Sequence, residues 1–145
     1  MKNYILNNNT CAVIATYSGC TIIDNKGNTL LEERAYNLLK YNCEHYGCSY
    51  NDRVTDSKSL LNASYKLPIV INDKDNFIMF PTSSFRCDSC SWINIGMVDK
   101  YYQQRKNKTV VIFKNKQKII LDISYFILEK QIMRASRMIS LLPIE

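Results

Sequence analysis

Seven cations crowded into one stretch of the chain are the residues best suited to bind a ligand. The stretch, residues 100–118, contains no acid, and the remaining sequence has twelve Lys or Arg against thirteen Asp or Glu, so the formal net charge of +6 resides here. A regional cluster of positive charge is typical of a site for a polyanion, although charge runs also occur on turns that contact only solvent. The seven cations are Lys100, Arg105, Lys106, Lys108, Lys114, Lys116 and Lys118.

Six cysteines and one histidine offer a second kind of chemistry, metal binding. Cys87 and Cys90 form a C-x-x-C pair. Three further soft ligands, which together with this pair could close a tetrahedral zinc site, are Cys43, His45 and Cys48. Since a lone C-x-x-C is a weak motif and the spacing of the other three is unusual for zinc, we expect free structural thiols, no metal and no cofactor.

Catalysis has little support in the sequence. There is a single His, and there are no paired acids, no phosphate-binding glycine loop and no nucleophile elbow. A Cys nucleophile activated by His45 is the enzymatic alternative. We therefore expect a binding protein and not an enzyme.

Length and composition predict a single intracellular domain, residues 1–145. A chain of 145 residues that is 46% hydrophobic can bury a sizeable core, and it has no low-complexity segment or linker. No stretch approaches the ~20 apolar residues of a membrane span, and the apolar run near the N-terminus is too short for a secretory signal. We expect reduced cysteines and a cytoplasmic location.

The elements that must position these residues begin with short apolar runs separated by turn residues, which predict strands and hairpins. The expected strands cover residues 4–6, 11–17, 21–24, 29–31, 68–71 and 77–80. Apolar residues at helical spacing predict a helix over residues 32–45. Residues 48–62 are polar and have no clear period, so we expect a loop there with one helical turn near residues 57–61.

The basic stretch is predicted to be an antiparallel meander of three strands joined by short turns. The strands are expected over residues 92–102, 109–113 and 119–123. Successive turns of a meander lie at opposite ends. The cations of residues 105–108 and those of residues 114–118 should therefore be about 17 to 20 Å apart, the length of the middle strand at ~3.3 Å per residue. Such a spacing suits a ligand with two rows of phosphates. Alternatively, one cluster of cations could enter a groove of the ligand while the other contacts a neighbouring phosphate backbone.

A last helix is predicted over residues 124–142, with Ser124 as its N-cap and Pro143 as its stop. Apolar residues follow one side of it at intervals of three and four, which predicts packing on the sheet or a seam shared between subunits. The residues that we assign to a subunit seam are Leu128, Ile132 and Ile139. The cations of a second stripe, which would extend the positive surface, are Lys130, Arg134 and Arg137.

Together these elements predict an α+β fold: an antiparallel sheet of hairpins and a C-terminal meander, with one early helix and one C-terminal helix. The charge pattern favours a polyanion-binding protein. The alternative is a zinc-stabilised or adaptor-type protein-interaction module with no DNA specificity, in which the terminal seam binds a partner and the basic meander is only a solvated edge.

Five blocks of sequence have the order and spacing of a known family. They are YGCSY at 46–50, LPIVI at 67–71, FIMFPTSS at 77–84, CSWI at 90–93 and ISY at 123–125. Through these blocks, above all FPT followed at short range by Cys-x-Trp-Ile, the chain resembles the competence transcription factor (ComK) family of low-GC Gram-positive bacteria over roughly residues 38–138. It departs from that family in ending at Glu145, without the C-terminal extension of longer relatives, and in having Cys87 as well as Cys90 before the Trp.

The resemblance implies a DNA-binding transcriptional activator that acts as an oligomer on paired A-tract and T-tract boxes, read from the minor groove. It also implies that a Clp adaptor and protease control the protein, that the protein interacts with RNA polymerase, and that it is located at the nucleoid. The polyanion is then double-stranded DNA. Because narrow A-tract grooves attract inserted Arg side chains, we expect Arg105, at a turn tip, to enter the minor groove while the lysines contact phosphates.

Overall fold

The structure is a computed structural model that describes residues 4–142. Its strands are β1 (Thr10–Thr16), β2 (Gly19–Asp24), β3 (Gly27–Leu31), β4 (Ile69–Asn72), β5 (Phe77–Pro81), β6 (Trp92–Asn94), β7 (Val98–Arg105), β8 (Lys108–Phe113) and β9 (Lys118–Leu121). Its helices are α1 (Ala35–His45), α2 (Tyr50–Leu61) and α3 (Tyr125–Leu141). Helices flank antiparallel strands, so the predicted α+β class is confirmed.

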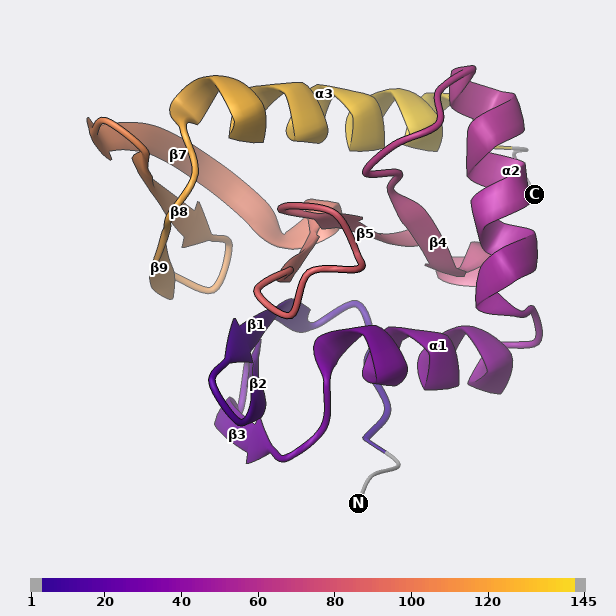
Figure 1. Cartoon of the computed structure of the whole chain (residues 1–145), viewed down its shortest axis with the longest axis horizontal. Coiled ribbons are helices and arrows are strands. Elements are labelled where there is room, and N and C mark those ends of the chain that lie inside the picture. The colour runs from indigo at the N-terminus through magenta and orange to yellow at the C-terminus, as the bar shows by residue number, and fades with distance from the viewer. Residues whose placement is uncertain (1–3, 143–145) are drawn as a thin grey trace.

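The strands form two sheets where the sequence predicted one. The larger has six strands in the order β3-β2-β1-β6-β5-β4, and the smaller has three in the order β7-β8-β9. Figure 1 shows the three-stranded sheet at one end of the molecule and α2 at the other, with α3 lying along one side. Among the described helices, none has the length and apolar character needed to cross a membrane.

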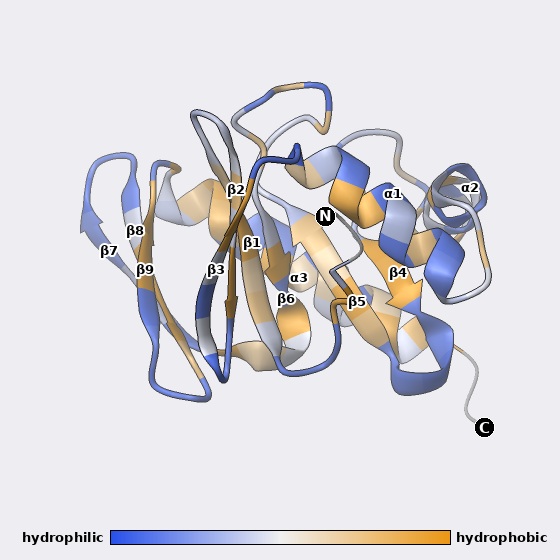
Figure 2. Ribbon diagram, turned by 90° about the horizontal axis from the view of Figure 1, so that it is seen from below, coloured by the Kyte–Doolittle hydropathy of each residue, from blue (hydrophilic) through white to orange (hydrophobic). Residues whose placement is uncertain are grey.

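The inner strands β5 and β6 of the six-stranded sheet are buried on both faces, whereas the edge strand β3 is partly exposed. In β5, Phe77 and Met79 belong to the hydrophobic cluster that includes α1 and the start of α2. Their neighbours Ile78 and Phe80 belong to a second cluster, shared with α3 and the three-stranded sheet. A continuous apolar run is typical of a strand that is covered on both sides. Figure 2 shows hydrophobic residues gathered on these inner strands and hydrophilic residues at the turns.

Helix α1 confirms the predicted early helix but begins at Ala35 and not at residue 32. Strand β3 keeps its pairing with β2 as far as Leu31, opposite Cys20, so residues 32–34 are needed to turn the chain. The buried side of α1, at the spacing of its apolar residues, consists of Ala35, Leu38, Leu39, Asn42 and Cys43.

The strand predicted over residues 4–6 does not form. Side chains from α1 and its C-terminal end hold this segment instead. The Leu6 N–H donates to Asn42 Oδ1 at 2.8 Å, and the Tyr46 hydroxyl donates to the Leu6 carbonyl at 2.5 Å. The Asn42 amide also donates to the Tyr4 carbonyl at 3.0 Å. The backbone polar groups are therefore satisfied without a strand partner.

Helix α2 replaces the loop predicted over residues 48–62. Two of its polar residues are buried and find partners around the β4–β5 hairpin. The Ser57 hydroxyl donates to the Pro68 carbonyl at 2.6 Å, and the Arg53 guanidinium lies 3.7 Å from the Asp73 carboxylate. The sequence of α2 shows no apolar period because the buried side of the helix is partly polar. Tertiary packing, which supplies most helical stability in proteins, stabilises this helix instead.

The strand predicted over residues 92–102 is broken into two strands that belong to different sheets. A 3₁₀ turn, Ile95–Met97, separates β6 from β7. Asn94 holds this turn, since its Oδ1 accepts from the Gly96 N–H at 2.9 Å while its amide donates to the Thr10 carbonyl at 2.8 Å. Strand β6 therefore stays between β1 and β5, and β7 starts the three-stranded sheet, in which the predicted β8 and β9 follow.

Helix α3 confirms the predicted terminal helix, with Ser124 as an N-cap that accepts a backbone hydrogen bond at 3.1 Å. Its predicted stop, Pro143, lies outside the described residues. Two residues assigned to a subunit seam, Leu128 and Ile132, are instead buried in the core of the same chain, and Ile139 is 37% exposed. The apolar side of the helix is used inside the chain because a sheet lies beside it to be covered.

Candidate nucleic-acid interface

One side of the three-stranded sheet is packed in the core, and the other faces outward. Val111, Phe113 and Leu121 belong to the core cluster shared with α3. Residues that alternate with them along the strands point to the opposite side, and directly paired residues share a face. The pairing thus forms two outward rows, which we call the outer face: Lys100, Ile112 and Lys118 in one, and Tyr102, Val110 and Ile120 in the other.

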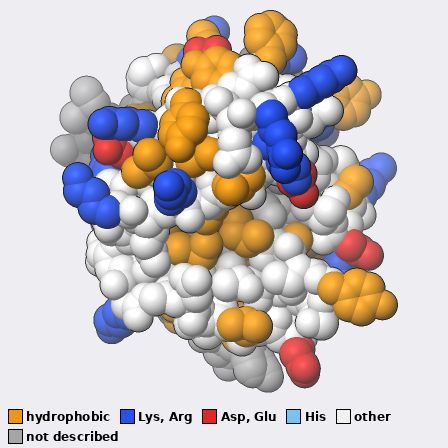
Figure 3. Space-filling view, turned by 90° about the vertical axis from the view of Figure 1, so that its left-hand side faces the viewer, with side chains coloured by type: hydrophobic (Ala, Val, Ile, Leu, Met, Phe, Trp, Pro, Cys, Tyr) orange, Lys and Arg blue, Asp and Glu red, His pale blue; other side chains and the backbone are white. Residues whose placement is uncertain are grey.

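Exposed apolar side chains lie among the cations of the outer face. Tyr102 is 47% exposed and Ile120 is 53% exposed, and between them they flank the buried Val110. Figure 3, which looks at this end of the molecule, shows Lys and Arg side chains spread around hydrophobic ones. Cations interleaved with an aromatic ring are typical of nucleic-acid-binding surfaces. The sequence analysis missed Tyr102 and Ile120, which the alternation of Lys100 and Tyr102 along one strand could have indicated.

The two turns of this sheet place cations at opposite ends of β8, as the meander predicted. Arg105 and Lys106 lie at the β7–β8 turn, and Lys114 and Lys116 lie at the β8–β9 turn. Strand β8 has six residues, so the two groups are about 17 Å apart along it at ~3.3 Å per residue. The sheet therefore has a basic group at each end and an apolar band between them.

The β8–β9 turn is fixed to the rest of the protein. The Lys114 N–H donates to the Met97 carbonyl at 2.8 Å. The Asn115 amide donates to the Asn25 side chain, in the β2–β3 turn, also at 2.8 Å. At the other end, only the pair of Arg105 and Lys108 lies beyond Thr109, where the pairing of β8 with β9 stops. Hydrogen bonds thus tie the basic group of the β8–β9 turn to the rest of the protein.

Ion pairing separates Lys108 from the other six cations of the basic stretch. Lys108 forms an ion pair with Asp122, just after β9. Within residues 4–142 the other six form no ion pair, and all are exposed. They are Lys100, Arg105, Lys106, Lys114, Lys116 and Lys118. These six are free to meet a polyanion, whereas the charge of Lys108 is partly neutralised.

The three helix cations predicted to extend the positive surface are not equivalent. Lys130 and Arg137 are exposed on α3. Arg134 is turned toward the segment before β4: its guanidinium donates to Gln131 Oε1 at 3.0 Å and to the Lys66 carbonyl at 3.5 Å. Burial lowers the pKa of Arg134. Arg134 therefore helps to hold α3 in place, and Lys130 and Arg137 remain available.

The structure does not bring the zinc candidates together. Cys43 is buried on one side of α1, whereas His45, two residues further on, is exposed. The Cys90 thiol is buried and lies 3.4 Å from the Ser83 carbonyl, and Cys87 is exposed. Between residues 4 and 142, no group of three or more His, Cys, Asp or Glu side chains could hold a metal ion.

All six cysteines are free, and the buried ones are poor nucleophiles. Burial raises the pKa of the Cys43 thiol to about 12 and that of the Cys20 thiol to about 11. A thiol with so high a pKa is protonated at neutral pH and behaves as a small hydrophobic residue. The enzymatic alternative, a Cys activated by His45, therefore gains no support from the neighbouring Cys43.

The fold and the outer face define a basic α+β protein that carries its excess positive charge on the open side of a small antiparallel sheet. Comparison with known proteins identifies the particular family. The family model described as ComK protein matches residues 1–143, so the chain belongs to the ComK protein family.

A curated relative supports the same family. The competence transcription factor of Bacillus subtilis (strain 168) is 28% identical over 99 residues, which cover 68% of this chain and 52% of that protein. The chain thus spans about half the length of the curated relative it matches. No solved structure matches the chain.

Proposed function

We propose that the protein is a sequence-selective, DNA-binding transcriptional activator of the competence type. It uses the outer face of the three-stranded sheet and its two turns to bind A/T-rich boxes from the minor groove. The observation that carries this proposal is the set of six exposed, unpaired cations around Tyr102 and Ile120, in a chain of the ComK family. A basic sheet with one open face is suited to bind a polyanion. Because the relative is described as a competence transcription factor, we take that polyanion to be double-stranded DNA.

The two basic groups have different tasks in this proposal. Arg105, exposed at the β7–β8 turn, enters the narrow minor groove, where A-tracts concentrate negative potential. The cations that contact phosphates are Lys100, Lys106, Lys114, Lys116 and Lys118. Phosphate contacts position the protein and supply salt-dependent affinity, whereas the inserted Arg supplies preference for A/T sequence. Lys108 has a smaller part than the sequence suggested, because Asp122 pairs with it.

A salt titration of DNA binding tests the phosphate contacts. If about five lysines neutralise phosphates, log K should fall against log salt with a slope of about −4 to −5. Removing Lys114 or Lys116 should reduce the magnitude of that slope by about one without changing the preferred sequence. A slope near zero would contradict the proposed surface.

Base substitution tests whether the protein reads the DNA sequence from the minor groove. Inosine–cytosine pairs present the minor-groove pattern of A·T and a major groove like that of G·C. Binding to A-tract boxes should survive this replacement, and Arg105→Ala should erode the preference for A-tracts over scrambled DNA. Loss of binding on the inosine boxes would instead assign readout to a strand or to the exposed helix cations Lys130 and Arg137.

The proposal includes a symmetric oligomer on paired half-sites. The buried Leu128 and Ile132 cannot form its seam, so the apolar residues left exposed on α3 are the surface we assign to it. They are Phe126, Ile127, Met133 and Leu141, which share one side of the helix, whereas Ile139 lies on the opposite side, beside the core residues. Sedimentation at micromolar concentration, with and without DNA, should show a dimer or larger species, and a monomer under both conditions would exclude this part of the proposal.

The remaining partners follow from the activator role. An activator of transcription works with RNA polymerase at the nucleoid, in the cytoplasm, and the family resemblance adds a Clp adaptor and protease. The proposal assigns no catalytic activity and no cofactor to the chain. Co-purification with RNA polymerase, and degradation by a reconstituted Clp system, would test these partners one by one.

A further inference from the structure

A pocket of about 650 Å³ lies between α2, the segment before β4 and the loop from β5 to β6. Figure 1 shows α2 and the three-stranded sheet at opposite ends of the molecule, so the pocket is separate from the proposed DNA surface. A cavity of this volume suits a ligand of small-molecule size.

Aromatic side chains form the inner wall of the pocket. Trp92 is 1% exposed and Tyr50 is 5% exposed, and their ring centroids are 6.4 Å apart at a steep angle. Phe85, from the loop, lies 6.0 Å from Tyr50 between ring centroids. All three line the pocket. An apolar group, above all a flat ring, would find edges and faces of aromatic rings to pack against.

Cations surround the mouth of the pocket without acids to balance them. Lys58, Lys66 and Arg86 line it and are exposed, and within the described chain none of them forms an ion pair. No Asp or Glu is among the described residues that line the pocket. Arg86 lies over the Phe85 ring, 5.5 Å from its centroid, so positive charge is held directly beside the apolar wall.

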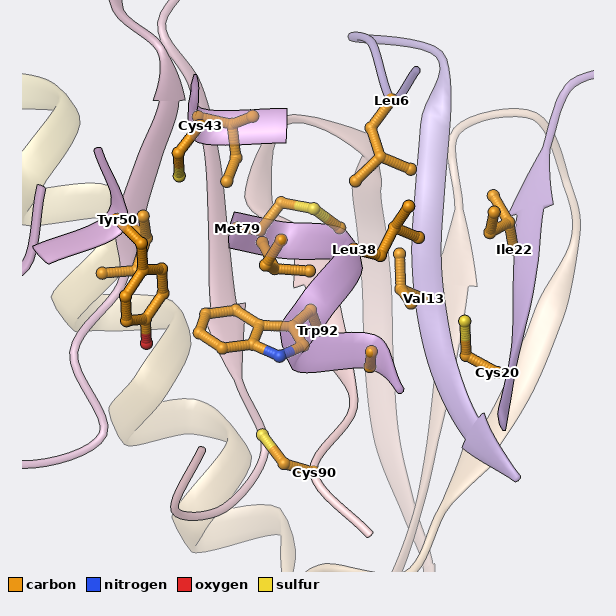
Figure 4. Close-up of a cluster of buried hydrophobic side chains, with 14 of the residues drawn as sticks. Leu6, Val13, Cys20, Ile22, Leu38, Cys43, Tyr50, Met79, Cys90 and Trp92 are labelled. Atoms are coloured by element: carbon orange, nitrogen blue, oxygen red, sulfur yellow. The ribbon is translucent and has the colours of Figure 1, made fainter. Parts of the chain in front are cut away.

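Two polar groups of the aromatic wall can donate hydrogen bonds, the Trp92 indole N–H and the Tyr50 hydroxyl. The indole N–H of Trp92 is buried and has no hydrogen-bond partner among the described residues. Figure 4 shows the Trp92 nitrogen and the Tyr50 hydroxyl oxygen on the same side of the cluster, the side toward Cys90. Burial raises the pKa of Tyr50, so its hydroxyl keeps its proton. A ligand that complements two donors and three cations must bring acceptors and negative charge.

We propose that this pocket binds a small amphipathic anion, that is, an aromatic or branched apolar group that carries a carboxylate or a phosphate. The apolar group packs among Tyr50, Phe85 and Trp92, and the anionic group lies between the cations at the mouth, within reach of Lys58 and Arg86. The inference is independent of the proposed DNA binding, since neither the residues nor the surface are shared.

The chain contains a single Trp, so its indole N–H signal in a proton–nitrogen NMR spectrum of the full chain reports on this pocket alone. The probes are naphthalene-2-carboxylate and its neutral counterpart naphthalene-2-carboxamide, which differ in charge but hardly in shape. The carboxylate should move the Trp92 signal saturably and bind at least about fivefold more tightly than the amide, a difference of about 1 kcal/mol.

Charge variants locate the anion. K58Q/R86Q should weaken carboxylate binding about fivefold, to the level of the amide, with the remaining backbone signals unchanged. K26Q/K74Q, which removes the same charge from two exposed turns elsewhere, should bind as the natural chain does. If K58Q/R86Q does not fold, R86Q alone, on the exposed loop, serves in its place. An unmoved Trp92 signal at millimolar carboxylate, equal affinity for the two probes, or equal loss in K26Q/K74Q would each overturn the proposal.

Discussion

The two sheets of this protein differ in how many of their faces are covered. The inner strands of the six-stranded sheet have α1 and the start of α2 on one face, and α3, the end of α2 and the three-stranded sheet on the other. These strands carry apolar residues at consecutive positions. The three-stranded sheet is covered on one face only. Its strands alternate between core residues such as Val111 and outward residues such as Lys100 and Tyr102.

If the proposed function holds, this difference lets one chain separate stability from DNA binding. Residues between two covered faces cannot change without a loss of packing, whereas the open face of an antiparallel sheet tolerates charge because water solvates it. Substitutions in the first region should therefore change the free energy of unfolding, and substitutions in the second should change affinity for DNA.

The largest effect should come from Phe80→Ala. Phe80 is fully buried between the two sheets, so its truncation leaves a cavity and should lower the free energy of unfolding by about 3–5 kcal/mol. Ile120→Ala removes a side chain that is 53% exposed on the outer face and should cost about 0.5 kcal/mol or less. Urea denaturation followed by circular dichroism measures both, and equal losses would remove the distinction between the sheets.

Asn42→Ala should have the next largest effect. The buried Asn42 side chain holds the backbone of Tyr4 and Leu6, and its loss leaves polar groups without partners, at a cost of about 1–3 kcal/mol. The matched control is Asn37→Ala, because Asn37 lies on the same helix and bonds only an exposed carboxylate, that of Glu33. Comparable losses in the two variants would mean that the N-terminal segment adds little to stability.

On the open face, the double variant Lys100→Ala/Lys118→Ala should weaken DNA binding about tenfold at ~0.1 M salt and reduce the salt slope by about two. These lysines flank Ile112 in one outward row, so on the proposed function they should contact the same stretch of the DNA backbone. Urea denaturation should show an unchanged midpoint. Lys26→Ala/Lys74→Ala is the control for net charge, and an equal loss of affinity there would mean that only total charge matters.

The smallest effect should come from the ion pair at the edge of the outer face. Asp122→Asn frees Lys108 and removes a negative charge, so DNA binding should become about twofold tighter. For the same reason Lys108→Ala should weaken binding less than Lys106→Ala does. Fluorescence anisotropy with labelled duplex resolves such changes, and weaker binding by Asp122→Asn would show that the ion pair supports the surface instead of masking it.

Sequence patterns predicted those elements whose signals are local. Helix α3 was predicted from its cap Ser124 and an apolar period, and α1 from a similar period with an error of three residues at its start. Two strands of the basic meander, β8 and β9, were predicted from β-rich runs between basic turns, whereas the strand predicted over residues 92–102 is divided between β6 and β7. Helix α2 was missed, because the partners of Ser57 and Arg53 are Pro68 and Asp73, which lie 11 and 20 positions further along the chain than the side chains they stabilise.

The candidate site was likewise predicted only where its sequence signal is local. The positive charge of residues 100–118 is visible in the sequence, and so is its division between two turns. Its accessible members are not visible, because Asp122 is brought to Lys108 by the pairing of β8 with β9, and Lys66 to Arg134 by the packing of α3. Tyr102 and Ile120 are placed in one row, on either side of Val110, only by the register of three strands.

The sequence by itself determined the α+β class, the terminal helix, the hairpins and the place of the excess charge, because caps, periods and turn residues act over a few positions. Only the tertiary structure decided that residues 92–102 divide between two sheets and that Leu128 and Ile132 serve the core of their own chain. It also decided that Trp92, Tyr50 and Phe85 enclose a pocket. These outcomes depend on contacts between residues far apart in the chain, which no local pattern records.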